Sequence, residues 1–146
     1  MSVRDTPPPE ADRLDPAPHP RHTAQVFGHE AVEQVFLAAH TAGRLHHAWL
    51  LTGPKGIGKA TLAWRLARFL LATPPAEGGL FGAPEPPGSA DIAPDHAVAR
   101  RMAALSEPRL CLVRRPFVAQ TGRLATQIPI DEVRRLKSFF QMSAAD

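Results

Sequence analysis

The chain has 146 residues, 44% of them hydrophobic and 21% charged, which is the size and composition of roughly one globular domain. No apolar run approaches the ~18 residues of a membrane helix, and residues 1–22 lack the apolar stretch of a secretory signal. The single cysteine, Cys111, excludes a disulfide framework and a zinc site built from several cysteines. We therefore expect a soluble, cytoplasmic protein with no membrane contact. The net charge of +3 permits contact with phosphates without requiring it.

Proline divides the chain. Six of the 16 prolines lie in residues 1–20 and six more lie in residues 74–94. Proline lacks the backbone donor that a helix or a central strand needs. Residues 1–22 hold few large apolar groups, and ten of the 21 residues at 74–94 are Pro or Gly. The sequence therefore predicts a disordered Pro-rich arm over 1–22, and a flexible Pro/Gly-rich insert over 74–94 within a folded part that spans 23–146.

The remaining chain alternates helical and strand-like patterns, which is typical of an α/β protein. The first predicted helix depends on apolar residues at helical spacing, namely Val32, Val35, Phe36 and Ala39. The predicted elements, in chain order, are a helix over 29–42, a strand over 48–52, a helix over 59–72, a short helix capped by Asp95 and ending near Leu105, a strand over 109–113, a loop to Pro129, and a helix capped by Asp131.

A glycine-rich turn lies between the first predicted strand and the second predicted helix. Residues 53–61 read GPKGIGKAT and fit the pattern G-x-x-x-x-G-K. Glycines at these positions let the backbone direct its N–H groups at phosphate oxygens, and the start of the helix adds further N–H groups and its positive dipole end. Lys59 would bridge the β- and γ-phosphates of a nucleotide. The turn therefore predicts a P-loop.

Position 60 departs from the strict pattern, which has Ser or Thr where this chain has Ala60. The missing hydroxyl normally binds Mg²⁺, and Thr61 lies about 100° further round the helix. The predicted strand over 109–113 also ends without the acid that a hydrolysing site uses. The sequence thus favours a site that holds a nucleotide over one that hydrolyses it. A P-loop nucleotide kinase, a small ATPase and a stand-alone nucleotide-binding module remain as alternatives.

Several stretches together resemble one family. They are VFGHE at 26–30, GRLHHAWLL at 43–51, GPKGIGK at 53–59, EPRL at 107–110 and IPIDEVR at 128–134. In order and spacing they are similar to the start of the delta-prime family of clamp-loader subunits, which are AAA+ proteins of bacterial DNA polymerase III. The resemblance covers residues 23–146 and is weakest over 74–105.

The resemblance implies an AAA+ P-loop module, with a parallel sheet in the order 5-1-4-3-2, that is truncated before the acidic strand. The predicted strands over 48–52 and 109–113 would then lack their native partners. Many relatives carry a four-cysteine zinc module where this chain has the cysteine-free insert, so we expect no zinc. The nucleotide-binding residues implied near the adenine are Val26, Phe27 and Gly28, and those implied around the phosphates are Gly53, Pro54, Lys55, Gly56, Ile57, Gly58, Lys59, Ala60 and Thr61.

The resemblance also implies a function in DNA replication. The chain would take part in loading the sliding clamp, with other clamp-loader subunits and the clamp as partners and with primed DNA reached through the complex. ATP would be bound weakly or without hydrolysis, so no catalytic residue is expected. The holoenzyme is a DNA-directed DNA polymerase, whereas this chain is not expected to catalyse a reaction by itself.

Overall fold

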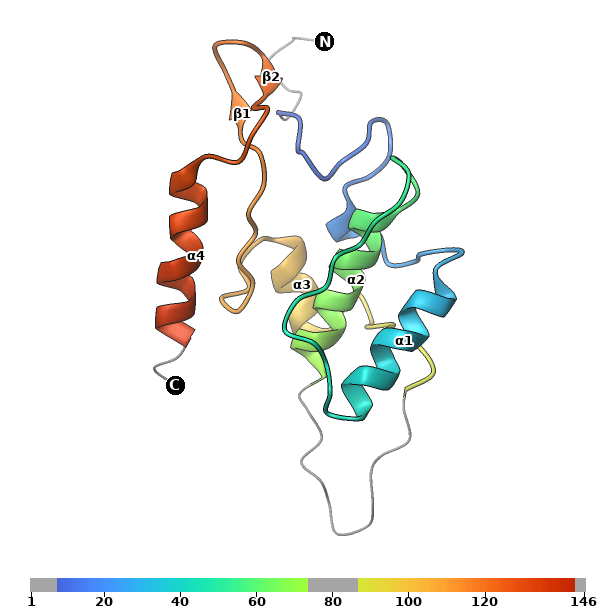
Figure 1. Ribbon diagram of the computed structural model, residues 1–146. Coiled ribbons are helices and arrows are strands. Elements are labelled where there is room, and N and C mark those ends of the chain that lie inside the picture. The colour runs from blue at the N-terminus through green and yellow to red at the C-terminus, as the bar shows by residue number, and fades with distance from the viewer. Residues whose placement is uncertain (1–7, 74–86, 144–146) are drawn as a thin grey trace. The chain divides into compact units, whose positions relative to one another are not determined.

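The computed structural model describes residues 8–73 and 87–143, which belong to two compact units (Figure 1). The P-loop unit comprises Pro18–Glu107, and the hairpin unit combines Met1–Ala17 with Pro108–Asp146. Within the described ranges, no helix has both the length and the apolar character needed to cross a membrane.

The P-loop unit is helical in its described residues. Its elements are η1 (Pro20–His22), α1 (Glu30–Thr41), α2 (Lys59–Ala72) and α3 (Ala97–Ala103). The predictions of helices over 29–42 and 59–72 are confirmed to within one residue at each end. Helix α2 is central, because it packs against η1 and α3 and also shares a core with α1 (Figure 1).

Two faces of α2 are buried. One face meets α1, and the buried members of that core are Phe36, Leu37, Leu62, Leu66, Phe69 and Ala90. On another face Trp64 packs edge-on against the ring of His19, with 5.8 Å between the centroids. The predicted apolar face of α1 is confirmed at Phe36, which is buried, and is wrong at Val32 and Val35, which are exposed. Glu33 and Leu37 are buried instead.

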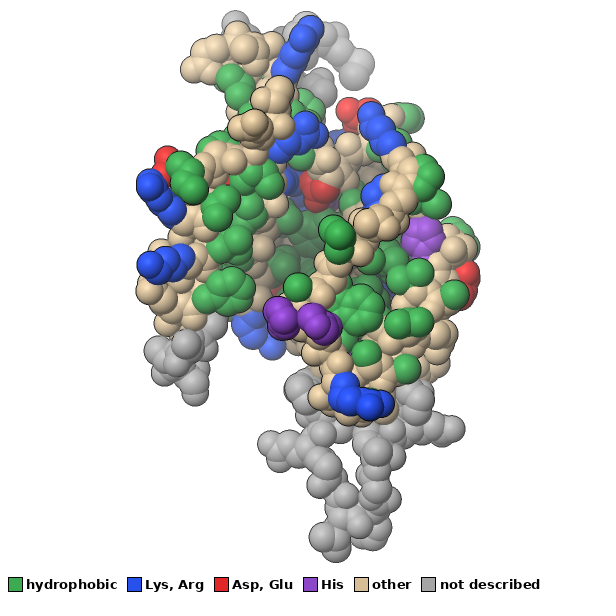
Figure 2. Space-filling view, viewed as in Figure 1, with side chains coloured by type: hydrophobic (Ala, Val, Ile, Leu, Met, Phe, Trp, Pro, Cys, Tyr) green, Lys and Arg blue, Asp and Glu red, His purple; other side chains and the backbone are tan. Residues whose placement is uncertain are grey.

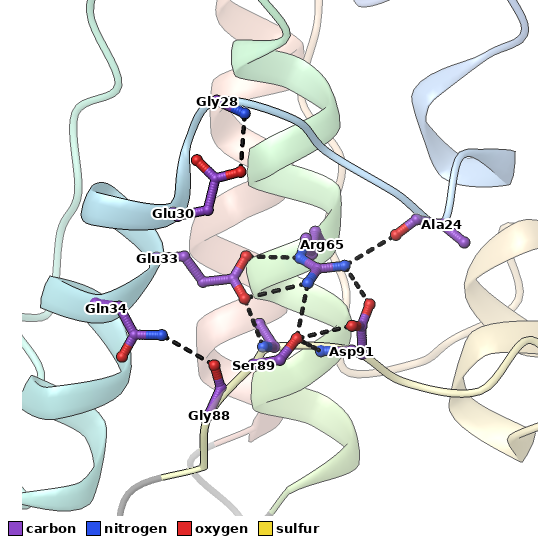
Figure 3. Close-up of polar contacts among 10 residues, drawn as sticks. Ala24, Gly28, Glu30, Glu33, Gln34, Arg65, Gly88, Ser89 and Asp91 are labelled. Carbon is purple, nitrogen blue, oxygen red and sulfur yellow. Dashed lines mark hydrogen bonds and ion pairs between the residues drawn. The ribbon is translucent and has the colours of Figure 1, made fainter.

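Glu33 is buried because it forms an ion pair with Arg65 of α2 (Figure 3). The Arg65 guanidinium donates through Nε to Oε2 at 2.7 Å and through Nη2 to Oε1 at 3.1 Å, and it also pairs with the exposed carboxylate of Asp91. The hydrogen bond to Glu33 raises the pKa of Arg65, and the same bond lowers the pKa of Glu33. Both groups therefore stay charged in the folded protein.

The same ion pair connects segments that are far apart in the sequence. Arg65 also donates to the carbonyl oxygen of Ala24 at 2.9 Å and to Oγ of Ser89 at 3.0 Å, while the N–H of Ala90 donates to Glu33 Oε1 at 2.7 Å. Helices α1 and α2, the segment before α1 and the segment at 89–91 thus meet at one guanidinium (Figure 3).

The hairpin unit contains β1 (Phe117–Val118), β2 (Arg123–Leu124) and α4 (Ile130–Ser143). The two strands pair antiparallel, and the turn between them ends at Gly122, whose φ of 64° lies in the left-handed region. Arg114 forms ion pairs with Glu10 and Asp12, both at 2.7 Å, which hold the N-terminal segment of this unit.

Several predicted details are wrong. Residues 48–52 and 109–113 are described but form no strand, because a strand needs a paired neighbouring strand and the described residues form one strand pair, β1 with β2. The expected α/β module is therefore seen here only as helices and one small hairpin, and that hairpin occupies a segment predicted as a loop.

Two helix starts also differ from the predictions. Helix α3 is capped by Nδ1 of His96 and not by Asp95, because the imidazole accepts a hydrogen bond from the N–H of Val98. Helix α4 begins at Ile130, so Asp131 lies inside its first turn rather than at the cap.

The arm and the insert lie partly outside the described residues. Residues 1–7 and 74–86 belong to that part. Residues 8–22, which the sequence assigns to a disordered arm, include η1 and the acids that pair with Arg114. Residues 87–94, assigned to the flexible insert, include Ser89 and Asp91 of the Arg65 network.

The Arg65–Glu33 pair generates a stability prediction. Replacing Glu33 by Gln leaves the charge of Arg65 buried with only the exposed Asp91 as a counter-ion. We expect the free energy of unfolding to fall by about 3 kcal/mol, the usual cost of removing one partner from a buried pair. Urea unfolding at pH 7, followed by circular dichroism, measures the change.

Asp91→Asn is the matched control, because the Asp91 side chain is 68% exposed. It should cost less than about 1 kcal/mol. Since the pKa of Glu33 is lowered from 4.5, the contribution of Glu33 to stability is present above that pH and is lost as the pH falls through the lowered value. The difference between the Glu33→Gln variant and the parent chain should therefore shrink in acid. Equal effects of both substitutions at pH 7 would contradict the assigned role of Glu33.

Candidate nucleotide-binding site

The predicted P-loop has the backbone of a turn that requires glycine. The φ angles are 140° at Gly53, 85° at Gly56 and 97° at Gly58, all in a region that L side chains rarely adopt. A Cβ at Gly58 would also lie 3.5 Å from Nε2 of His29. The three glycines therefore allow a tight loop between residue 52 and the start of α2.

Helix α2 begins without a side-chain cap. Its N-cap residue is Gly58, in the left-handed conformation, and no side chain there accepts a hydrogen bond from the first turn. The first N–H groups of a helix have no partner within the helix, and they carry its positive dipole end. This arrangement suits an anion placed at the loop.

Lys59 lies across the loop. Its Nζ donates to the carbonyl oxygens of Gly53 at 2.7 Å and Pro54 at 2.6 Å. An ammonium group has three donors, so these two bonds leave one donor for a further acceptor. Two backbone carbonyl oxygens of the loop thus hold the positively charged ammonium group of Lys59 beside the loop.

A pocket of about 380 Å³ opens beside the loop, within the usual size range of ligand sites. Its walls come from the start of α1, the segment at 50–52, the loop and the first turns of α2. The lining residues are Gly28, His29, Val32, Leu50, Leu51, Thr52, Ile57, Lys59 and Leu62. Apolar walls around one fixed cation suit a ligand with both an apolar part and an anionic part.

The carboxylate of Glu30 fixes the wall formed by the start of α1. Its Oε1 accepts a hydrogen bond from the N–H of Gly28 at 3.1 Å. Hydrogen bonds from the backbone N–H groups of Glu30 itself and of Gly28 lower the pKa of Glu30. The acid therefore holds the backbone just before α1, where His29 provides no side-chain cap.

The structure brings together only some of the predicted site residues. Gly28, Ile57 and Lys59 line the pocket. Val26 instead packs against the core, and the Phe27 side chain is 80% exposed. Val26 and Phe27, which were predicted to lie near the adenine together with Gly28, therefore do not line the pocket.

The other predicted residues form the loop and the first turn of α2. Those in the loop are exposed or half-buried, and they are Gly53, Pro54, Lys55, Gly56 and Gly58; Ala60 and Thr61 are half-buried in the helix. The sequence analysis missed His29, Val32, Leu50, Leu51, Thr52 and Leu62 as lining residues. The only signal for them is position. His29 belongs to the VFGHE stretch, residues 50–52 come directly before the loop, and Val32 and Leu62 lie in the first turns of α1 and α2.

The phosphate part of a nucleotide fits these residues better than a bound metal does. Among the pocket-lining residues that the structure describes, none is a carboxylate, and the helix presents a methyl group at Ala60. No cluster of three or more His, Cys, Asp or Glu side chains suited to a metal ion occurs in residues 8–73 and 87–143. The arrangement can hold phosphates by backbone N–H groups and Lys59.

Comparison with known proteins relates part of the chain to DNA polymerase III. The gamma/tau subunit of Mycobacterium tuberculosis strain H37Rv is 40% identical over 81 residues, half of this chain. The gamma subunit of Buchnera aphidicola from Acyrthosiphon pisum is 39% identical over 51 residues, 35% of this chain. The matched parts cover 14% of the length of each relative. No protein-family model and no solved structure matches the chain.

These similarities support a relationship of up to half of the chain to DNA polymerase III gamma and gamma/tau subunits. They do not single out the delta-prime type, because the relatives are gamma and gamma/tau subunits.

The loop geometry predicts a specific sensitivity at Gly58. In the Gly58→Ala variant the new methyl group must adopt a φ of 97° beside His29, so we expect a loss of about 1–3 kcal/mol in the free energy of unfolding. The matched control is Gly88→Ala, where a Cβ meets nothing within 4 Å and φ is not in the left-handed region. Thermal unfolding of both variants measures the difference. Equal melting temperatures would refute the strained conformation.

Proposed function

We propose that this chain carries the nucleotide-binding part of a bacterial clamp-loader subunit. The observation that carries the proposal is the uncapped start of α2 behind a three-glycine loop, with Lys59 fixed across it beside a 380 Å³ pocket. The partial similarity to DNA polymerase III gamma and gamma/tau subunits supports the same assignment.

Within that class we propose the delta-prime type, which acts in the cytoplasm. The stretches VFGHE, GRLHHAWLL and GPKGIGK support this choice. Ala60 in place of a metal-binding hydroxyl supports a subunit that binds ATP with little or no hydrolysis. Its partners would be the other clamp-loader subunits and the sliding clamp, and primed DNA would be reached through the complex.

A P-loop kinase or ATPase is a weaker proposal. Such an enzyme uses Mg²⁺ to neutralise charge on the transferred phosphoryl group. The described pocket offers neither a hydroxyl at position 60 nor a carboxylate among its lining residues. Nucleotide retention therefore agrees with the site better than phosphoryl transfer.

Substitution of Lys59 tests nucleotide binding. The ammonium makes a charge-assisted contact with phosphate, so Lys59→Ala should weaken ATP binding by about 10- to 100-fold. Titration with a fluorescent ATP analogue measures the dissociation constant. Lys137→Ala, which removes an exposed lysine of α4, is the control and should leave the constant unchanged.

Two outcomes would contradict the proposal. If the Lys59→Ala variant and the parent chain bound the ATP analogue with equal affinity, the loop would not be the nucleotide-binding site. In a separate arm, the chain is immobilised and challenged with the purified gamma subunit of the same organism. Failure to capture it would contradict the clamp-loader assignment and leave nucleotide binding intact.

A further inference from the structure

Two arginines on α2 are buried in contrasting ways. Arg65 and Arg68 lie three residues apart, and their exposed fractions are 7% and 6%. Arg65 has two carboxylate partners, Glu33 and Asp91. Across the described residues, Arg68 forms no ion pair, and its guanidinium has one hydrogen bond, from Nη2 to the carbonyl oxygen of Arg21 at 3.0 Å. Arg68 is thus a buried cation with no counter-ion among residues 8–73 and 87–143.

A second pocket, the Arg68 pocket, is lined in part by Arg68. It has a volume of about 170 Å³ and is lined by Arg21, His22, Ala24, Arg68, Ile92, Pro94, Ala99 and Ala103. It shares no lining residue with the P-loop pocket. Three of its lining residues are basic, none is acidic, and the others are small or apolar.

A charge in these surroundings is costly. Burial and the neighbouring charge of Arg65 both lower the pKa of Arg68, burial being the larger cause. An arginine nevertheless stays protonated in proteins, so the cost is not relieved by loss of a proton. It is relieved when an anion binds and supplies the missing partner.

The size of the Arg68 pocket suits a small anion such as phosphate. Its volume of about 170 Å³ corresponds to five or six water molecules at ~30 Å³ each, and a phosphate ion has five non-hydrogen atoms. The planar guanidinium can donate two parallel hydrogen bonds to two oxygens of one phosphate. Arg21 adds a second guanidinium to the lining, and its Nε donates a hydrogen bond to Nε2 of His22 at 3.2 Å.

We propose that the Arg68 pocket binds a phosphate group, with the buried guanidinium of Arg68 as its main ligand and Arg21 beside it in the wall. This site is separate from the P-loop. The phosphate is either the free ion or the head of a small phosphate ester, since both present the same oxygens to the guanidinium.

The test uses amide NMR spectra of the whole 146-residue chain carrying Lys59→Ala, which weakens phosphate binding at the P-loop. Inorganic phosphate is titrated in, with sodium chloride of equal ionic strength as the reference. We expect saturable shifts at the amides of Ala24, Ala99 and Ala103, with half-saturation on the order of 1 mM. Methyl phosphate, titrated in parallel, separates the two sources: equal binding indicates an ester head group, and weaker binding indicates the free ion.

Two variants in the same Lys59→Ala background keep the proposal falsifiable. Arg68→Met removes the charge at similar length and should raise the half-saturation concentration at least about tenfold. Ala103→Leu keeps the charge and fills the pocket, so it should have the same effect even if Arg68→Met fails to fold. The proposal is overturned if phosphate shifts the amide signals no more than chloride does, or if the folded variants bind phosphate as tightly as the parent chain does. It is also overturned if acetate binds as tightly as phosphate. Because the P-loop is disabled throughout, these outcomes do not bear on nucleotide binding.

Discussion

The structure of the P-loop unit depends on the ion pair between Arg65 and Glu33. A buried arginine is tolerated only where acceptors surround it, and here the acceptors come from α1, from the segment before α1 and from the segment at 89–91. The pair therefore sets how α1 lies against α2. Since Gly28 and His29 at the start of α1 form one wall of the P-loop pocket, the same contact places that wall opposite the loop. A polar interaction, rather than apolar packing alone, thus positions the candidate site.

Helix α2 serves the candidate site in two ways. Its N-terminus supplies unpaired N–H groups and Lys59, while its body anchors the loop to the rest of the unit through Leu62, Leu66 and Phe69. The loop keeps the features that hold phosphate, and position 60 lacks the hydroxyl that would hold a metal beside it. Apolar side chains remain exposed over α1 and over the segment that precedes α2 (Figure 2). The exposed apolar residues of this unit include Phe27 before α1, Val35 in α1 and Leu50 before α2. The unit therefore combines the proposed nucleotide site with much apolar surface still open to water.

Local patterns in the sequence predicted the features that depend on neighbouring residues. Helical spacing located α1 and α2, and the G-x-x-x-x-G-K spacing located the three glycines with positive φ. Features that depend on distant residues were missed. Glu33 enters the core instead of Val32 only because Arg65 lies opposite, 32 positions later. The prediction of strands over 48–52 and 109–113 was wrong because a strand forms only by pairing with a second strand, and a local sequence pattern does not show whether that second strand is present. The hairpin around Gly122 did have a local signal, which was overlooked. That signal is a glycine in a four-residue turn between two short runs that contain apolar residues.

The central claim is that this P-loop holds ATP without metal-assisted chemistry, and the dependence of ATP affinity on Mg²⁺ tests it most directly. The dissociation constant for ATP is measured by calorimetry with Mg²⁺ and with EDTA, and phosphate release is followed in the same samples. Because Ala60 offers no ligand to the metal, the two constants should agree within about threefold, and no phosphate should be released. Binding that is at least about tenfold tighter with Mg²⁺, or phosphate release that Lys59→Ala abolishes, would contradict the account.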